Sequence, residues 1–181
     1  VCSPTRAAMM TGQAPGRLHL TNHAPGHKDG FSLEGSNLRE AESVRHLALS
    51  YVTIAERLSE AGYITAHLGK WHLSYVSRKS SEGITEPELR PDRQGFDINI
   101  GGTHSGMPRS YFWPKWRGNP PIEGRREGEY LPDRLTSEAI RVIDDFARKQ
   151  KPWLLYMSYY TVHTPFHSKQ EKTAKYATKA R

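Results

Sequence analysis

The sequence has little cysteine, no long apolar run and no excess of acidic charge. One cysteine in 181 residues excludes an internal disulfide framework and a cysteine-rich zinc site. No apolar stretch approaches the length of a membrane helix, so we expect no membrane span. No basic region followed by an apolar stretch marks a signal peptide. Because the first residue is Val1 rather than Met, we expect the chain to begin inside a longer protein.

Basic residues outnumber acidic ones. Lys and Arg total 26 against 19 Asp and Glu, a net charge of +7 with His neutral. This balance favours anionic partners such as nucleic acid, acidic glycans or sulfate esters. The basic residues are scattered, except in the tail from Lys169 to Arg181, and no nucleic-acid-binding motif accompanies them. We therefore expect no nucleic-acid partner.

The middle of the chain contains a helix followed by a strand. Thr53 and Glu56 have the spacing of a capping box, and Gly62 is a natural residue to follow the end of the helix. Residues 63–68, rich in aromatic and β-branched side chains, predict a strand. The apolar face of the helix is expected to contain Ile54, Ala55, Leu58 and Ala61.

The same order recurs near the C-terminus, with a helix predicted over residues 136–149 and a strand, buried on both faces, over 153–160. Two such units predict an α/β fold with a largely parallel sheet. Residues 13–50 are predicted to be a long loop, and residues 74–132 to be loops with a short edge strand. The later helix is expected to bury Ala139, Ile140, Ile143, Phe146 and Ala147.

The cysteine lies at the start of a third predicted helix, Cys2 to Gly12. Ser3 is a suitable N-cap, so Cys2 is expected just before the helix N-terminus, where backbone N–H groups and the helix dipole favour an anion. A lone cysteine is otherwise a small buried apolar residue, but Cys2 has polar and turn-forming neighbours.

Polar residues follow both predicted strands. Lys70 and His72 follow the first strand and His163 follows the second, at the sheet edge where open α/β sheets bind ligands. In an extended segment Lys70 and His72 would point to the same side, where a Lys charge and a His hydrogen bond suit an oxyanion. Considered alone, Lys70 is interpreted as a surface charge and each histidine as a structural residue. Their occurrence together with Cys2 favours an anion-binding site.

These residues stand in motifs of a known family. Cys2-Ser3-Pro4-Thr5-Arg6, followed by Gly12, resembles the first sulfatase signature. Gly62-Tyr63-Ile64-Thr65, running on to Gly69-Lys70-Trp71-His72-Leu73, resembles the second.

The resemblance extends over nearly the whole chain. Leu154-Leu155-Tyr156 leading into His163-Thr164-Pro165 is similar to the strand and loop that deliver a substrate-facing histidine, and residues 16–21 are most similar to the arylsulfatase A and galactosamine-6-sulfatase branch. The resemblance implies an alkaline-phosphatase-like α/β fold, its largely parallel sheet flanked by helices. Residues 1–181 would form a single partial catalytic domain that lacks a preceding metal-binding strand and the later strands.

The resemblance also implies a sulfuric ester hydrolase acting on aryl or sugar sulfates. A formylglycine-generating or other sulfatase-maturing enzyme would oxidise Cys2 to formylglycine, whose hydrate attacks sulfur and then eliminates sulfate. Arg6 would hold the hydrate, Lys70 would clamp a sulfate or leaving-group oxygen, and His72 would hydrogen-bond the hydrate. His163 would donate a proton to the departing ester oxygen. The resemblance places such enzymes in the periplasm, the lysosome or the secreted fraction.

Sulfatases also hold a divalent cation, Ca²⁺ or another such as Mg²⁺, through oxygen ligands. The family's paired metal-binding acids have no counterpart in this sequence, so Cys2 as formylglycine is the one metal contact expected here. Asp144-Asp145 lies mid-helix, where adjacent side chains diverge, and is interpreted as a solvated face. A loop is favoured over a metal site for the histidines at 19, 23 and 27, with Arg17 and His19 expected near the pocket entrance. We expect the isolated chain to have little activity.

Two other functions remain open. A phosphohydrolase of the same superfamily would share the fold, although such enzymes use Ser or Thr as the nucleophile. A non-catalytic, polyanion-binding fragment would use the +7 charge and the basic tail. Substrate specificity is expected from residues 100–130, whose aromatic side chains could stack on a sugar ring; these are Tyr111, Phe112, Trp113 and Trp116.

Overall fold

A three-stranded parallel sheet lies at the centre of the protein, as seen in a computed structural model that describes residues 2–24, 26–27, 30–75 and 87–179. The strands have the order β2-β1-β3, and both neighbours run parallel to β1. This arrangement confirms the predicted α/β class. The elements in chain order are α1 (Cys2–Thr11), α2 (Ile54–Glu60), β1 (Ile64–Gly69), 3-10 turns at Pro87–Leu89 and Pro91–Arg93, β2 (Ile98–Ile100), α3 (Leu131–Ala147), β3 (Trp153–Ser158) and α4 (Gln170–Ala177).

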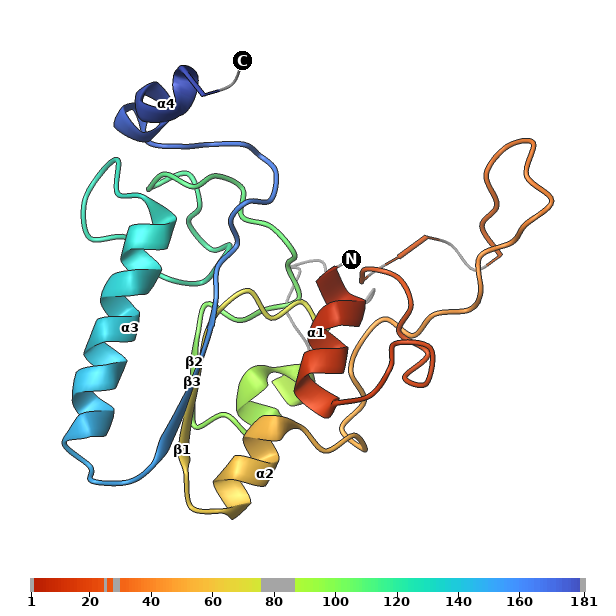
Figure 1. Cartoon of the computed structure of the whole chain (residues 1–181), viewed down its shortest axis with the longest axis horizontal. Helices are drawn as coiled ribbons and strands as arrows, with labels where there is room; N and C mark the ends of the chain where they lie inside the picture. The colour runs from red at the N-terminus through yellow and green to blue at the C-terminus, as the bar shows by residue number, and fades with distance from the viewer. Residues whose placement is uncertain (1, 25, 28–29, 76–86, 180–181) are drawn as a thin grey trace.

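Helices cover both faces of the sheet (Figure 1). On one face α3 packs against β1, with Val142 and Phe146 buried beside Leu68. On the other face α1 and α2 contribute Met10 and Ala55 to a second core. None of the described helices is long and apolar enough to cross a membrane.

The first helix–strand unit is confirmed. The Thr53 hydroxyl accepts from the Glu56 N–H at 3.1 Å, and a Glu56 carboxylate oxygen accepts from the Thr53 N–H at 2.6 Å, which completes the capping box. The predicted apolar face is partly wrong, because Ala55 is buried while Ile54 is 45% exposed and Ala61 is exposed. Ile54 instead borders a hollow of about 600 Å³ between the end of α1 and the start of α2.

The second unit is confirmed in type but not in detail. α3 begins at Leu131 with a proline in its first turn, before the predicted start at residue 136. The predicted buried face is wrong at Ile140 and Ile143, which are 57% and 37% exposed, and at Ala147, which is also exposed. β3 is also only partly buried along most of its length, because in the described sheet it is an edge strand.

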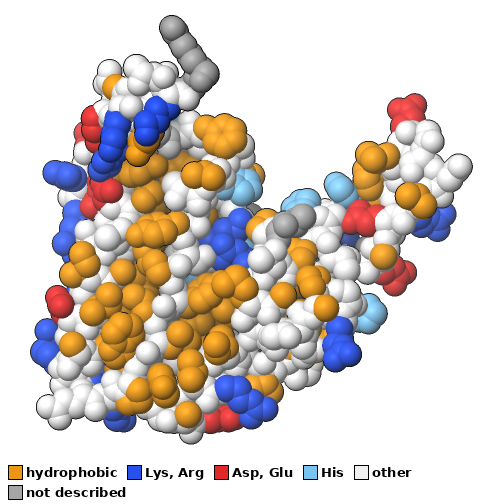
Figure 2. All heavy atoms as spheres, in the orientation of Figure 1, with side chains coloured by type: hydrophobic (Ala, Val, Ile, Leu, Met, Phe, Trp, Pro, Cys, Tyr) orange, Lys and Arg blue, Asp and Glu red, His pale blue; other side chains and the backbone are white. Residues whose placement is uncertain are grey.

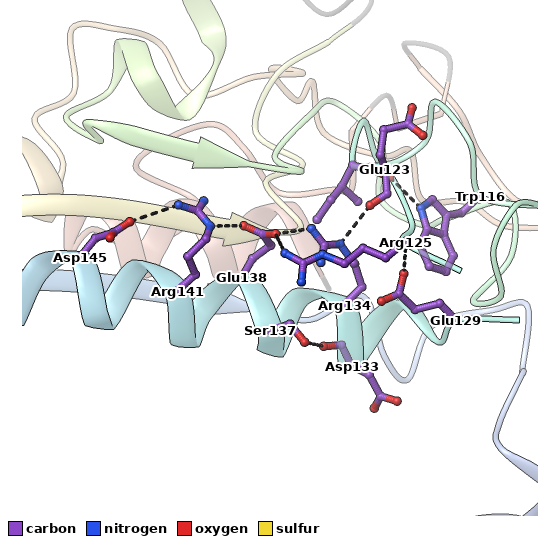
Figure 3. Close-up of polar contacts among 11 residues, drawn as sticks. Trp116, Glu123, Arg125, Glu129, Asp133, Arg134, Ser137, Glu138, Arg141 and Asp145 are labelled. Atoms are coloured by element: carbon purple, nitrogen blue, oxygen red, sulfur yellow. Dashed lines mark hydrogen bonds and ion pairs between the residues drawn. The ribbon is translucent and has the colours of Figure 1, made fainter. Parts of the chain in front are cut away.

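A buried charge network explains the rotated face of α3. Glu138 accepts from buried Arg134 and from Arg141, the latter at 2.9 Å, and Arg125 lies 3.7 Å away. Arg134 Nε donates to the Glu123 carbonyl at 3.0 Å. Figure 3 shows these side chains joining α3 to the preceding loop. Polar residues therefore occupy helix positions where the apolar pattern alone predicts solvent.

The long loop predicted over residues 13–50 is confirmed for its described residues, which contain no helix or strand. Residues 30–44 extend away from the rest of the molecule (Figure 1). At the base of this extension His27 Nδ1 lies 2.8 Å from a Glu40 carboxylate oxygen. The exposed helix α4, which carries no buried residue, lies within the basic tail.

Candidate active site

Three separate segments bring Cys2, Arg6 and Lys70 together. Arg6, one turn after Cys2 on α1, donates from Nη1 to the Lys70 carbonyl at 2.5 Å and to the Ser158 hydroxyl at 2.6 Å. The Lys70 ammonium group in turn donates a hydrogen bond to Cys2. Figure 2 shows Lys and Arg side chains at the bottom of a hollow between the parts of the molecule that carry α1 and α3. The structure thus joins three of the predicted site residues.

Gly69, the last residue of β1, allows Lys70 to reach this position. Its φ is +92°, and a Cβ at this residue would lie 1.9 Å from the Ser158 carbonyl oxygen. That carbonyl accepts from the Lys70 N–H at 2.8 Å. His72 also has a positive φ, +59°, so the prediction of an extended segment over 70–72 is wrong. The chain turns sharply after β1 because only glycine fits beside Ser158.

His72 is held in a single tautomer. Its Nε2 lies 2.6 Å from the Ala24 carbonyl, so Nε2 carries the proton and donates it. The Ser3 hydroxyl donates to the His72 carbonyl at 2.9 Å and accepts from the Ala24 N–H at 3.0 Å. Ser3 therefore lies inside α1 and ties three segments together, and the prediction that it is the N-cap is wrong. Nδ1 of His72 is buried and has no hydrogen-bond partner in the described part of the chain.

Burial keeps the His72 imidazole neutral. It lowers the pKa of His72 to about 4; the hydrogen bond to Ala24 opposes the shift, and the charges of Lys70 and Arg6 add to it. At neutral pH the lone pair of Nδ1 can therefore accept a hydrogen bond.

The two cations of the site have no neutralising carboxylate. Within the described ranges neither Arg6 nor Lys70 forms an ion pair with Asp or Glu. Lys70 is only 4% exposed; burial lowers its pKa, Cys2 opposes that shift, and the charge of Arg6 lowers it further. Burial also lowers the pKa of Arg6. One buried and one half-buried positive charge beside Cys2, with no ion-pair partner among the described residues, favour an anionic ligand.

His163 lies near this group without joining its hydrogen bonds. Its backbone carbonyl accepts from the Tyr111 hydroxyl at 3.1 Å, and its ring Nδ1 lies 3.1 Å from the Thr164 hydroxyl. Burial is the main cause of the lowered pKa of His23, and the neighbouring His72 and His163 add to that shift. The role predicted for His163 stays a prediction.

A sequence model described as "Sulfatase" matches residues 1–181. The chain belongs to the sulfatase family. It is 31% identical to an uncharacterized sulfatase, YdeN, of Escherichia coli K12, over 91% of this chain and 28% of that protein. It is 28% identical to human N-acetylgalactosamine-6-sulfatase, over 93% of this chain and 31% of that one. This sulfatase chain thus spans about three-tenths of the length of these relatives.

Solved structures agree with this assignment. The crystal structure of Ps i-CgsB superposes with a TM-score of 0.63 at 27% identity, covering 99% of this chain and 39% of that one. A putative sulfatase, yidJ of Bacteroides fragilis, superposes with a TM-score of 0.64 at 22% identity, covering 97% of this chain and 37% of that one, and shows the same fold. The fold is therefore that of the alkaline-phosphatase-like sulfatases, as the motifs predict.

Ser158 and Ser3 are residues of this sulfatase site that sequence reasoning missed. Ser158 had a usable signal, because it is a polar residue at the carboxyl end of an apolar strand, where ligand sites form. The sequence signal at Ser3 is misleading, because a serine before a proline resembles a helix N-cap.

The expectation for the aromatic loop is wrong at two positions. Tyr111 and Trp116 are 1% and 0% exposed, and the Trp116 indole N–H donates to the Ile122 carbonyl at 2.9 Å. Both rings pack against the N-terminal part of α3 and are not available to stack on a substrate. Phe112 and Trp113 are partly exposed.

The described residues of this sulfatase chain do not form a metal site. No group of three or more His, Cys, Asp or Glu within them could hold a metal ion. Asp145 instead pairs with Arg141 and Arg148 on α3, as expected of a solvated face. His19 borders a separate hollow of about 370 Å³, together with residues 42–44.

Proposed function

We propose that the full-length protein hydrolyses sulfate esters at a residue made from Cys2. The proposal rests on the convergence of half-buried Arg6 and buried Lys70 near Cys2, with no carboxylate paired to either among the described residues. A sulfate ester presents a delocalised negative charge over several oxygens, which suits two cations with fixed positions. Residues 1–181 then form part of one catalytic domain.

Each side chain has a role that follows from its atoms. The Lys70 ammonium group reaches the Cys2 position and holds a sulfate oxygen there. Arg6 keeps N–H groups for the same anion, because its guanidinium has five. His72 accepts a hydrogen bond from the formylglycine hydrate at Nδ1, and His163 donates a proton to the leaving oxygen. In sulfatases formylglycine supplies an oxygen nucleophile with a second oxygen, which allows sulfate to be eliminated.

Sulfatases generally use a divalent cation, Ca²⁺ or Mg²⁺, beside the formylglycine. The described residues contain no group of three or more His, Cys, Asp or Glu that could hold such an ion. The cation's ligands belong to the proposal for the full-length protein.

The substrate class we propose is a sulfated glycan, with aryl sulfates as test substrates. Two comparisons support it: human N-acetylgalactosamine-6-sulfatase is a relative, and Ps i-CgsB has been crystallised with k-i-k-neocarrahexaose, at a TM-score of 0.62 and 26% identity. We further propose that a sulfatase-maturing enzyme modifies Cys2, and that the protein acts in the periplasm, in the lysosome or after secretion.

The test is hydrolysis of 4-nitrocatechol sulfate by the full-length protein, expressed with a maturing enzyme. We expect an aldehyde mass at the Cys2 peptide and a rate reduced at least about 1,000-fold in Cys2→Ala and Lys70→Ala. Lys151→Ala, which removes an exposed lysine far along the chain, is the matched charge control and should retain activity. An unmodified thiol, or a preference for 4-nitrophenyl phosphate, would contradict the proposal and favour the phosphohydrolase.

A further inference from the structure

We propose that Ser158 is a positioning residue that fixes Arg6 and Lys70 in their reactive geometry. The inference rests on the function proposed above, because it assigns Ser158 to the same reaction. Ser158 is the last residue of β3 and is 8% exposed. It contacts one cation with its side chain and the other with its backbone.

The side chain of Ser158 orients Arg6. Its hydroxyl oxygen accepts from Arg6 Nη1 at 2.6 Å, and the same nitrogen donates to the Lys70 carbonyl at 2.5 Å. Both hydrogens of Nη1 are thereby used on protein acceptors. A hydrogen bond from a charged guanidinium is about twice as strong as one between neutral groups, and burial removes competing water. The plane of the guanidinium is therefore set by Ser158 and Lys70 together.

The backbone of Ser158 positions Lys70. Its carbonyl accepts from the Lys70 N–H at 2.8 Å, just after the paired residues Gly69 and Ser158. The missing side chain of Gly69 permits this approach, because a Cβ would lie 1.9 Å from the carbonyl. Position 158 thus connects α1 to the segment that follows β1 through atoms of a single residue.

Such a connection is needed because the two cations repel each other. The charge of Arg6 adds to the effect of burial in lowering the pKa of Lys70. The electrostatic energy of the two neighbouring positive charges is therefore unfavourable until an anion binds. Without the Ser158 hydroxyl, Arg6 Nη1 loses one of two acceptors and the guanidinium can turn away from Lys70. A variant at Ser158 that keeps the backbone removes this side-chain contact alone.

The test compares Ser158→Ala and Ser158→Thr in the full-length protein. Thr keeps the hydroxyl and suits a strand residue. Ser74→Ala is the matched control, because Ser74 is 1% exposed and its hydroxyl has no hydrogen-bond partner in the described part of the chain. With 4-nitrocatechol sulfate, we expect kcat of Ser158→Ala to fall about 10- to 100-fold and KM to rise by less than that. Ser158→Thr should recover most of kcat, and Ser74→Ala should match the wild type.

A second measurement separates this inference from the proposed function. Calorimetry measures the affinity of the two cations for inorganic sulfate without requiring turnover. We expect Ser158→Ala to weaken this affinity about threefold to tenfold relative to Ser74→Ala. If the wild type is inactive but Ser158→Ala binds sulfate more weakly than Ser74→Ala, the hydrolase proposal fails and Ser158 keeps its positioning role. If Ser158→Ala matches Ser74→Ala in both assays, Ser158 has no positioning role. An equal loss in Ser158→Thr, with lowered melting temperatures in both variants, would show a purely structural role and overturn the inference.

Discussion

His67 makes the stability of the protein depend on pH. It lies in the middle of β1, is fully buried, and neither ring nitrogen has a hydrogen-bond partner among the described residues. Its ring stacks on Tyr156 at a centroid distance of 5.7 Å and meets Trp71 and Phe96 edge-on. The imidazole therefore occupies an aromatic core position as a neutral ring.

Burial is the main reason that the pKa of His67 falls to about 3. The charge of Arg6 lowers it further, while the neighbouring Lys70 backbone and Asn99 side chain, which do not meet hydrogen-bond geometry with the ring, oppose the shift. An unfolded histidine has a pKa near 6.5. Above that pH both states are neutral and the full stability is present. As the pH falls from 6.5 towards 3, His67 binds a proton in the unfolded state but not in the folded state. The free energy of unfolding therefore decreases.

Replacing His67 by Phe should remove this loss. Between pH 7 and pH 5, protonation of His67 in the unfolded state lowers the free energy of unfolding by about 2 kcal/mol. The slope is about 1.4 kcal/mol per pH unit below 6.5. Any packing cost of the larger ring is the same at both pH values and cancels in the comparison. His67→Phe should therefore gain about 2 kcal/mol relative to the wild type on going from pH 7 to pH 5.

Urea unfolding of both proteins at pH 7, 6 and 5 measures this difference. We expect the two free energies of unfolding to diverge steadily below pH 6.5 in favour of the variant. A difference between wild type and variant that is constant over this range would refute the reasoning, because it would mean that His67 binds its proton equally well in the folded protein.

Three further substitutions test contacts that hold the fold together. Gly69→Ala should cost more than about 3 kcal/mol of unfolding free energy in urea, because it combines a positive φ with a clash against the Ser158 carbonyl. Glu138→Leu should cost about 3–5 kcal/mol by leaving buried Arg134 unpaired, and the double variant with Arg134→Leu should recover much of that loss. Thr53→Ala should lower the melting temperature by an amount equivalent to about 1 kcal/mol through loss of the cap of α2. Smaller effects than these would show that the contacts are relaxed in solution.

Local features of the fold could be predicted from the sequence because their determinants are close together in the chain. Thr53 and Glu56 are three residues apart, and their capping box fixes the start of α2. The buried face of α3 could not be predicted in this way, since it depends on contacts with the preceding loop: Arg134 donates to the Glu123 carbonyl, and Arg125 lies 3.7 Å from Glu138. A periodic apolar pattern places such residues in solvent, and only tertiary pairing reverses that assignment.

The candidate site also contains residues that the sequence predicts and residues that it does not. The chemistry that an anion requires predicts Cys2, Lys70 and His72, and the first sulfatase signature predicts Arg6. The structure brings these residues together. The residues that hold them contact the main chain of the site: the Ser3 hydroxyl donates to the His72 carbonyl, and the Ser158 carbonyl accepts from the Lys70 N–H. Main-chain acceptors are the same at every position, so no side-chain pattern marks which of them are used. The sequence therefore identifies groups that react with a ligand more readily than groups that position them, and the second kind must be found from the folded chain.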